Sequence, residues 1–130
     1  MSGTTFRVHV TKDYLKFNAA HFIAYKGFRE ALHGHNYRVV VHAEARELDP
    51  ISYVLDFAAL KSAAVQVAGR FDHQNINEVE PFTQGGRNPT AEELARFLAE
   101  ELGHRFDDRR VRICKVEVFE TDNNRAEYCP

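Results

Sequence analysis

The sequence predicts an α+β fold, in which two helices pack on one face of an antiparallel sheet of about four strands. Apolar and polar residues alternate as in strands near both ends of the chain, two segments between them have helical periodicity, and no internal repeat is present. Consecutive helices between pairs of strands favour this layered arrangement over alternating strand–helix units. A chain of 130 residues suits one domain, so residues 1–130 are assigned to a single domain.

The first strand-forming segment alternates over residues 6–10 and again over 15–17, with a break at Lys12-Asp13. This pattern indicates a kinked strand or a pair of strands. Residues 21–32 have no clean period and predict an exposed loop. From residue 35 to residue 46 the alternation returns, which predicts a strand.

Two helices are predicted in the middle of the chain. Asp56 can cap a helix whose apolar residues recur at helical spacing until Gly69. Thr90-Ala91-Glu92-Glu93 is a capping box, in which the Thr90 hydroxyl accepts the Glu93 amide and the Glu93 carboxylate reaches back. This second helix is expected to end at Gly103. Residues 72–88 are polar and predict a long loop, which in a compact domain is usually functional.

The last two strands are predicted over residues 111–121 and 126–129. The longer one carries apolar residues at both odd and even positions, which predicts that both of its faces are covered. Helices on one side cannot cover both faces, and a small sheet leaves unpaired edges. We therefore expect the chain to form a homo-oligomer.

Charge and composition narrow the classes of partner. Lys plus Arg is 17 and Asp plus Glu is 19, a net charge of −2 with no basic stripe, so no nucleic-acid partner is expected. No apolar run approaches the ~20 residues of a membrane span, and the first residues lack the pattern of a signal peptide. We expect a cytoplasmic protein without a membrane partner. Cys114 and Cys129 are expected to be reduced thiols.

The placement of the histidines predicts a metal site. His33 and His35 are two residues apart, so on a strand both side chains leave the same face. His21 follows the first strand segment and would meet them if the two strands pair antiparallel. A lone histidine in a strand is more often structural, but three neutral imidazoles that leave an open coordination position are typical of catalytic zinc. His9, His42 and His104 lie outside any such cluster.

Acidic side chains mark two further candidates. In Asp72-His73 a carboxylate beside an imidazole could act as a general acid or base, although a solvated pair at a helix end is the alternative. Glu120 shares a strand face with Val116 and Val118, where a carboxylate is costly unless hydrogen bonds reach it. The N–H edge of a pterin or guanine ring would supply two donors. The alternative is a strand-end glutamate in water.

Six blocks in one order cover nearly the whole chain: FNAAH (17–21), LHGHNY (32–37), LDF (55–57), FDHQNIN (71–77), NPTAE (88–92) and FET (119–121). Together they resemble the 6-pyruvoyltetrahydropterin synthase family, which includes the carboxytetrahydropterin synthases of the queuosine pathway. The resemblance implies the tunnelling fold, in which the sheets of several subunits join in an oligomeric barrel. It implies a homo-oligomer, commonly a hexamer made of two trimers.

The resemblance also implies roles for these blocks in binding and converting a pterin triphosphate. It implies zinc (Zn2+) on His21, His33 and His35, substrate binding by Glu120, Thr121 and Thr90, and proton transfer by Asp72 and His73.

One departure from the family pattern decides the expected reaction. Members that make 6-pyruvoyl- or carboxytetrahydropterin carry a catalytic cysteine shortly before the HGH motif, and residues 24–32 contain none. Glu30 stands there instead, in the pattern Glu-x-x-His-Gly-His. This resembles the branch in which glutamate replaces the cysteine and the enzyme converts 7,8-dihydroneopterin triphosphate to 6-hydroxymethyl-7,8-dihydropterin for folate synthesis.

We therefore expect a zinc-dependent carbon–carbon lyase with Glu30 as its catalytic base. The first alternative is a 6-pyruvoyl- or 6-carboxytetrahydropterin synthase that acts on the same substrate. The second is a pterin- or zinc-binding protein without catalytic activity.

Overall fold

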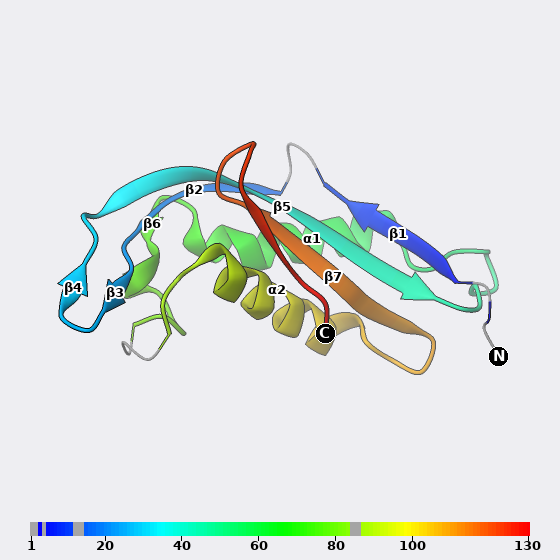
Figure 1. Ribbon diagram of the computed structural model, residues 1–130. Helices are drawn as coiled ribbons and strands as arrows, with labels where there is room; N and C mark the ends of the chain where they lie inside the picture. Colours follow the sequence, from blue (N-terminus) through cyan, green and yellow to red (C-terminus); the bar gives the residue numbers. More distant parts are fainter. Residues whose placement is uncertain (1–2, 4, 12–14, 84–86) are drawn as a thin grey trace.

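One mixed sheet and two long helices make up the computed structural model, which describes residues 3, 5–11, 15–83 and 87–130 (Figure 1). Its strands are β1 (Phe6–Val10), β2 (Lys16–His21), β5 (His33–Ala45), β6 (Gln74–Asn75), β7 (Val111–Phe119) and β8 (Arg125–Tyr128). They form a six-stranded sheet in the order β6-β2-β5-β7-β8, with β1 also paired to β5. The α+β class is confirmed.

The first strand segment is a pair of strands, one of the two predicted forms, and β1 and β2 pair with different parts of β5. The predicted break at Lys12-Asp13 lies outside the described residues. The predicted four-stranded, fully antiparallel sheet is wrong, because the sheet has six strands and one of its pairs is parallel. The segment predicted as a loop after α1 adds β6, which pairs parallel to β2. A two-residue strand carries no periodicity that a sequence could reveal.

Residues 21–32, predicted as a loop, contain a hairpin of β3 (Ala24–Tyr25) and β4 (Phe28–Arg29). Lys26 and Gly27 make its turn, with φ of 45° and 82°. Two successive residues with positive φ match the twist of the strands that they join, and glycine adopts this conformation at little cost. Figure 1 shows the hairpin at the end of the molecule where β5 begins.

The helices α1 (Phe57–Ala68) and α2 (Ala91–Phe106) begin where the sequence predicted. Asp56 accepts the amide of Ala58 at 3.0 Å, and Thr90 accepts that of Glu93 at 3.1 Å. The reciprocal half of the capping box is absent from the described contacts, because the Glu93 carboxylate pairs with two arginines, Arg87 and Arg96. α2 continues past Gly103 to Phe106.

Two short 3-10 helices, η2 (Gly69–Phe71) and η3 (Ile76–Glu78), follow α1 on either side of β6. The predicted loop from residue 72 is therefore partly regular. Among the described residues no helix has the length and apolar character needed to cross a membrane.

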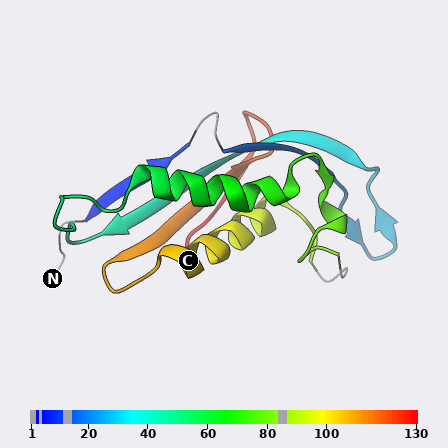
Figure 2. The same ribbon diagram turned by 180° about the vertical axis from the view of Figure 1, so that it is seen from behind.

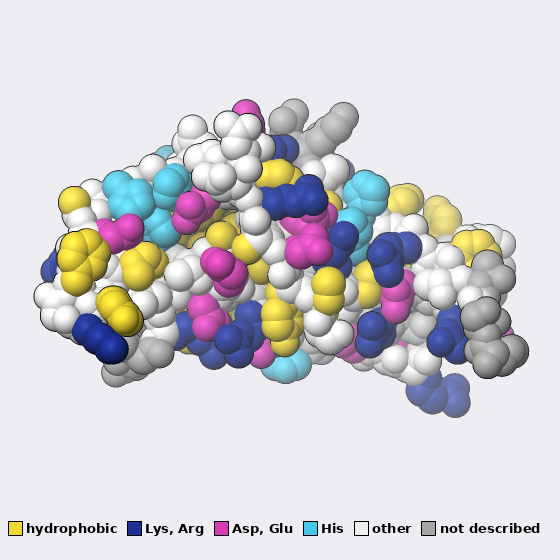
Figure 3. Space-filling model, in the orientation of Figure 1, with side chains coloured by type: hydrophobic (Ala, Val, Ile, Leu, Met, Phe, Trp, Pro, Cys, Tyr) yellow, Lys and Arg dark blue, Asp and Glu magenta, His cyan; other side chains and the backbone are white. Residues whose placement is uncertain are grey.

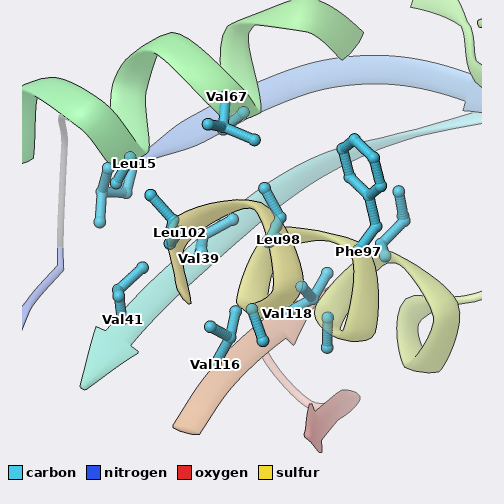
Figure 4. Packing of buried hydrophobic residues seen from close by; sticks show 14 of the residues in the cluster. Leu15, Val39, Val41, Val67, Phe97, Leu98, Leu102, Val116 and Val118 are labelled. Carbon is cyan, nitrogen blue, oxygen red and sulfur yellow. The ribbon is translucent and has the colours of Figure 1, made fainter. Parts of the chain in front are cut away.

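Both helices lie on the same side of the sheet, and the core fills the space between (Figure 2). In Figure 4, Val39 and Val41 of β5 and Val116 and Val118 of β7 face the helices. Leu98, Leu102 and Phe97 of α2, Val67 of α1 and Leu15 cover them. Fully burying one such side chain contributes about 1.5–3 kcal/mol.

A bulge in β7 explains why apolar residues occupy both odd and even positions. His42 pairs with Lys115 but Ala43 pairs with Ile113, so Cys114 is an extra residue. The alternation shifts there by one position, and Ile113 and Val116 both face the core. The pattern therefore does not show two apolar faces. The inference of an oligomer from such faces rests on a premise that is wrong.

His42, which the sequence left outside any cluster, forms a half-buried ion pair on the helix-free side of the sheet. Its Nε2 lies 2.6 Å from Oε2 of Glu117, whose side chain is only 9% exposed, and Arg125 contacts the same carboxylate at 3.3 Å. The Nδ1 of His42 is buried without a hydrogen-bond partner in the described structure. Burial lowers the pKa of His42, while Glu117 opposes this effect.

We expect His42 to make the protein less stable in acid. Because its pKa is lower in the folded chain, the unfolded chain takes up the proton first, and stability falls as the pH drops through the ordinary histidine value of about 6.5. In urea unfolding of metal-free protein at neutral and acidic pH, His42→Gln should lose less stability than the wild type. The exposed His104→Gln is the control, and an equal loss in His42→Gln would contradict the assignment.

Candidate functional site

Three imidazoles converge where β2 and β5 pair. His21 lies directly opposite His33 in the antiparallel register, and His35 follows on the same face of β5. The ring centroids are 4.7 Å apart for His21 and His33, 5.1 Å for His21 and His35, and 5.0 Å for His33 and His35. One ligand atom of each lies within 4.8 Å of the others. The predicted meeting of these residues, here the histidine cluster, is confirmed.

Backbone carbonyls orient two of these rings. Nδ1 of His21 lies 2.7 Å from the carbonyl oxygen of Pro89, and Nδ1 of His33 lies 2.9 Å from that of Ala31. A carbonyl only accepts hydrogen bonds, so each Nδ1 carries the proton and each Nε2 keeps its lone pair. Nε2 of His35 is buried without a hydrogen-bond partner among the described residues. Three nitrogen donors with such supporting hydrogen bonds fit a zinc ion.

The electrostatic environment favours neutral imidazole at His35. Burial lowers its pKa, and the neighbouring rings of His21 and His33 lower it further. The carboxylates of Glu120 and Glu30 oppose this shift. Neutral imidazole is the form that binds a metal, so the site is suited to binding near neutral pH.

Glu120 lies beside the histidine cluster, immediately after β7. Its Oε2 is 3.7 Å from Nε2 of His21 and 3.9 Å from Nε2 of His35, and its side chain is 28% exposed. These distances are too long for direct hydrogen bonds. The carboxylate can therefore accept hydrogen bonds from a molecule bound at the cluster. Figure 3 shows acidic side chains beside the histidines at this end of β5.

Glu30 is half-buried and follows the β3–β4 hairpin. Its Oε1 accepts the amide of Ile23 at 2.9 Å, and its own amide donates to the carbonyl of Ile23 at 2.9 Å. The charge of Glu30 opposes the lowering of the His35 pKa and adds to the effect of burial on the pKa of Tyr37. Its hydrogen bonds join Glu30 to Ile23, two residues after His21. That the segment between His21 and His33 brings Glu30 toward the cluster stays a prediction.

Asp72 and His73 face each other, although neighbouring residues often point apart. His73 has a φ of 59°, and its Nδ1 lies 3.0 Å from Oδ2 of Asp72. The other carboxylate oxygen accepts the amide of Asn18 at 2.9 Å. This hydrogen bond, then the contact with His73, lowers the pKa of Asp72.

The Asp72–His73 pair does not contact the histidine cluster of its own chain in the described structure. His73 lines a groove of about 450 Å³ whose other lining residues include His35 of the cluster. Asn18, Ala20, Gly34 and Asn36 also line it, and they alternate with the core-facing residues of β2 and β5, so most of the groove lies on the helix-free side.

Thr90 and Thr121 both have local structural contacts. The Thr90 hydroxyl caps α2, and that of Thr121 accepts the amides of Asn123 and Asn124 at 3.2 and 3.1 Å in the turn before β8. Their role in substrate binding stays a prediction.

Sequence reasoning missed Tyr37 as part of the site. Tyr37 is fully buried, stacks on Phe17 at 4.7 Å and meets the rings of His21 and His35 edge-on at 5.9 and 5.4 Å. Its hydroxyl has no hydrogen-bond partner among the described residues, and burial strongly raises its pKa. The sequence signal that could have identified Tyr37 is its position two residues after His35, on the same strand face.

Comparison with known proteins identifies the family. The sequence model described as 6-pyruvoyl tetrahydropterin synthase matches residues 9–130. The chain belongs to this family. Curated relatives and several structural neighbours of the chain are named as pterin synthases, so the protein is a pterin synthase enzyme of the 6-pyruvoyl tetrahydropterin synthase family.

Three relatives illustrate the range of the family. The chain is 32% identical to 6-carboxy-5,6,7,8-tetrahydropterin synthase of Bacillus subtilis, over 93% of this chain and 84% of that protein. The Caenorhabditis elegans 6-pyruvoyl tetrahydropterin synthase structure has a TM-score of 0.80 at 25% identity, covering 100% and 99% of the two chains. A Plasmodium vivax 6-pyruvoyltetrahydropterin synthase variant has a TM-score of 0.76 at 25% identity, covering 96% and 97%.

Proposed function

We propose that this enzyme converts 7,8-dihydroneopterin triphosphate to 6-hydroxymethyl-7,8-dihydropterin by zinc-dependent carbon–carbon cleavage. The observation that carries the proposal is Glu30, a carboxylate bonded to Ile23 and standing before the HGH motif where the family pattern has a cysteine. Two structures of Plasmodium vivax 6-pyruvoyltetrahydropterin synthase are variants of a glutamate described as a catalytic residue, which is alanine in one and cysteine in the other. They support glutamate as a catalytic group in this family.

His21, His33 and His35 would hold the zinc through Nε2, with Nδ1 of the first two fixed by carbonyls. A bound zinc supplies Lewis-acid chemistry, lowering the pKa of substrate hydroxyls near it. Glu120 lies close enough to accept hydrogen bonds from the amidine-like edge of the pterin ring.

Glu30 would act as the general base. It takes the proton of the C2′ hydroxyl, the C2′–O bond becomes a carbonyl, and the C1′–C2′ bond breaks. The electron pair of that bond moves into the C6–N5 imine of the ring, and C1′ then takes up a proton to give the hydroxymethyl product. The other product is an aldehyde that keeps the triphosphate, so no external oxidant or reductant is needed.

Asp72 and His73 would transfer protons at a substrate held by a neighbouring copy, because the pair lies on the helix-free side of its own sheet. This arrangement requires a homo-oligomer. We propose a hexamer of two trimers with a barrel of joined sheets, on the family resemblance alone, since the argument from apolar strand faces fails.

The second candidate is 6-pyruvoyl- or 6-carboxytetrahydropterin synthase activity on the same substrate, favoured by the names of the curated relatives and of the structural neighbours. A binding protein without activity is the third. The Asp72–His73 pair argues against it, because simple binding requires no proton-transfer pair.

The product formed by purified, zinc-loaded protein from 7,8-dihydroneopterin triphosphate separates the three candidates. We expect 6-hydroxymethyl-7,8-dihydropterin in mass spectrometry, with the triphosphate still attached to a two-carbon aldehyde. Free triphosphate together with a 6-pyruvoyl or 6-carboxy product would establish the second candidate. No turnover would leave the binding protein.

We expect one zinc per chain, and its loss when two ligands are removed together. The double variant His33→Ala with His35→Ala leaves one imidazole, too few to hold the ion, so metal content and activity should disappear together. Elemental analysis measures the metal, and Glu120→Gln, beside the cluster, is the control that should retain it. Full zinc in the double variant would refute the site.

Glu30→Gln should keep the fold and the zinc but lower kcat by about 10²–10⁴-fold, the usual contribution of a general base. The amide keeps an oxygen for the Ile23 hydrogen bond but cannot take a proton. Steady-state kinetics and zinc analysis measure both effects. Glu80→Gln, a carboxylate outside the site, is the control. Turnover near the wild-type rate would leave His73 as the remaining candidate base.

A further inference from the structure

Residues Phe22, Ile23 and Ala24 connect the last metal-ligand position of β2 to the β3–β4 hairpin. The amide and carbonyl groups of Phe22 and Ala24 point to one edge of this segment, and no β-strand of the described structure pairs with that edge. Two asparagine side chains take the place of the missing strand there. Oδ1 of Asn77 accepts the amide of Phe22 at 2.9 Å, and its Nδ2 donates to the carbonyl of Phe22 at 3.0 Å.

Asn88 repeats this arrangement two residues further along. Its Oδ1 accepts the amide of Ala24 at 3.0 Å, and its Nδ2 donates to the carbonyl of Ala24 at 3.0 Å. Each asparagine thus pairs both polar groups of one peptide residue, as a neighbouring strand would. Two complementary hydrogen bonds also fix which end of each amide is the donor.

Ile23, between these residues, presents its amide and carbonyl to the opposite edge, because backbone groups alternate along an extended segment. Both bind Glu30, the amide through Oε1 and the carbonyl through the Glu30 amide, each at 2.9 Å. The segment is therefore held by asparagines on one edge and holds Glu30 on the other. A shift of the segment would move the carboxylate.

We infer that Asn77 and Asn88 are positioning residues, which hold the Glu30 carboxylate in its productive place through residues 22–24. The inference rests on the proposed role of Glu30 as base. It assigns a function to two asparagines of the family blocks that the metal site and the substrate contacts leave unexplained. Glutamine cannot substitute for them without displacing the segment, since one more methylene separates the amide from the backbone.

Two single variants, Asn77→Ala and Asn88→Ala, test the inference, with Asn123→Ala in the exposed β7–β8 turn as the matched control. Each should lower kcat about 10–100-fold, the scale of a misplacement of about 1 Å, with KM and zinc content little changed. In the folded, metal-free variants, hydrogen exchange should accelerate at least about 10-fold at the Phe22 amide in Asn77→Ala and at the Ala24 amide in Asn88→Ala, since each of these amides loses its acceptor. The control should match the wild type in both measurements.

The decisive measurement repeats both substitutions in the Glu30→Gln background. Residues that act through Glu30 should cost no further activity once the base is gone, whereas a general structural role would lower the rate equally in both backgrounds. Equal losses, or wild-type kcat in both single variants, would overturn the inference. If Glu30→Gln itself keeps its rate, the proposed role of Glu30 as base fails, and with it the inference that the asparagines position a catalytic group, while the product assay still decides the reaction.

Zinc analysis of both variants protects the test against a trivial loss of metal. Asn88 precedes Pro89, whose carbonyl binds His21, and Asn77 bonds to Phe22, the residue after His21. Each variant should give the same kinetic result with full zinc content. Zinc loss that accounts for the whole effect in both variants would contradict the inference.

Discussion

The pairing of β2 with β5 is the constraint on which the site depends. The same register that places His21 opposite His33 places Phe17 opposite Tyr37 in the core. A slip by one residue would turn every β2 side chain to the other face, exposing Phe17 and removing His21 from the cluster. Core packing between these strands and the helices therefore specifies the geometry of the histidines, which lie on the continuation of the apolar face.

Backbone groups complete the site where the regular sheet ends. Beyond Ala20, carbonyls of Pro89 and Ala31 orient two imidazoles, and side-chain amides pair with the segment after His21. Each donor and acceptor of these irregular residues still needs a partner, because an unpaired buried polar group costs about 1–3 kcal/mol. Satisfying them with side chains from the segment before α2 ties the start of that helix to the histidine cluster.

Features with a local sequence pattern could be predicted, and features without such a pattern could not. The alternation over residues 35–46 predicted β5, and the caps at Asp56 and Thr90 predicted where the two helices begin. The two-residue spacing of His33 and His35 predicted the cluster. The β7 bulge at Cys114 shifts the alternation by one residue and reads as two apolar faces. The strands of the β3–β4 hairpin have two residues each, too few to show an alternation. The burial of the Tyr37 hydroxyl depends on distant contacts, which a local pattern does not contain.

The exchange of a cysteine for Glu30 changes what the backbone can do for the base. A carboxylate has two oxygens, so Oε1 can accept the Ile23 amide while Oε2 remains available to take a proton. A thiolate has a single sulfur, and a hydrogen bond that fixed it would also weaken it as a base. The longer glutamate side chain has more rotamers to restrict, and the Ile23 hydrogen bond restricts them. A glutamate base therefore needs a rigid partner segment, which the residues around Ile23 supply.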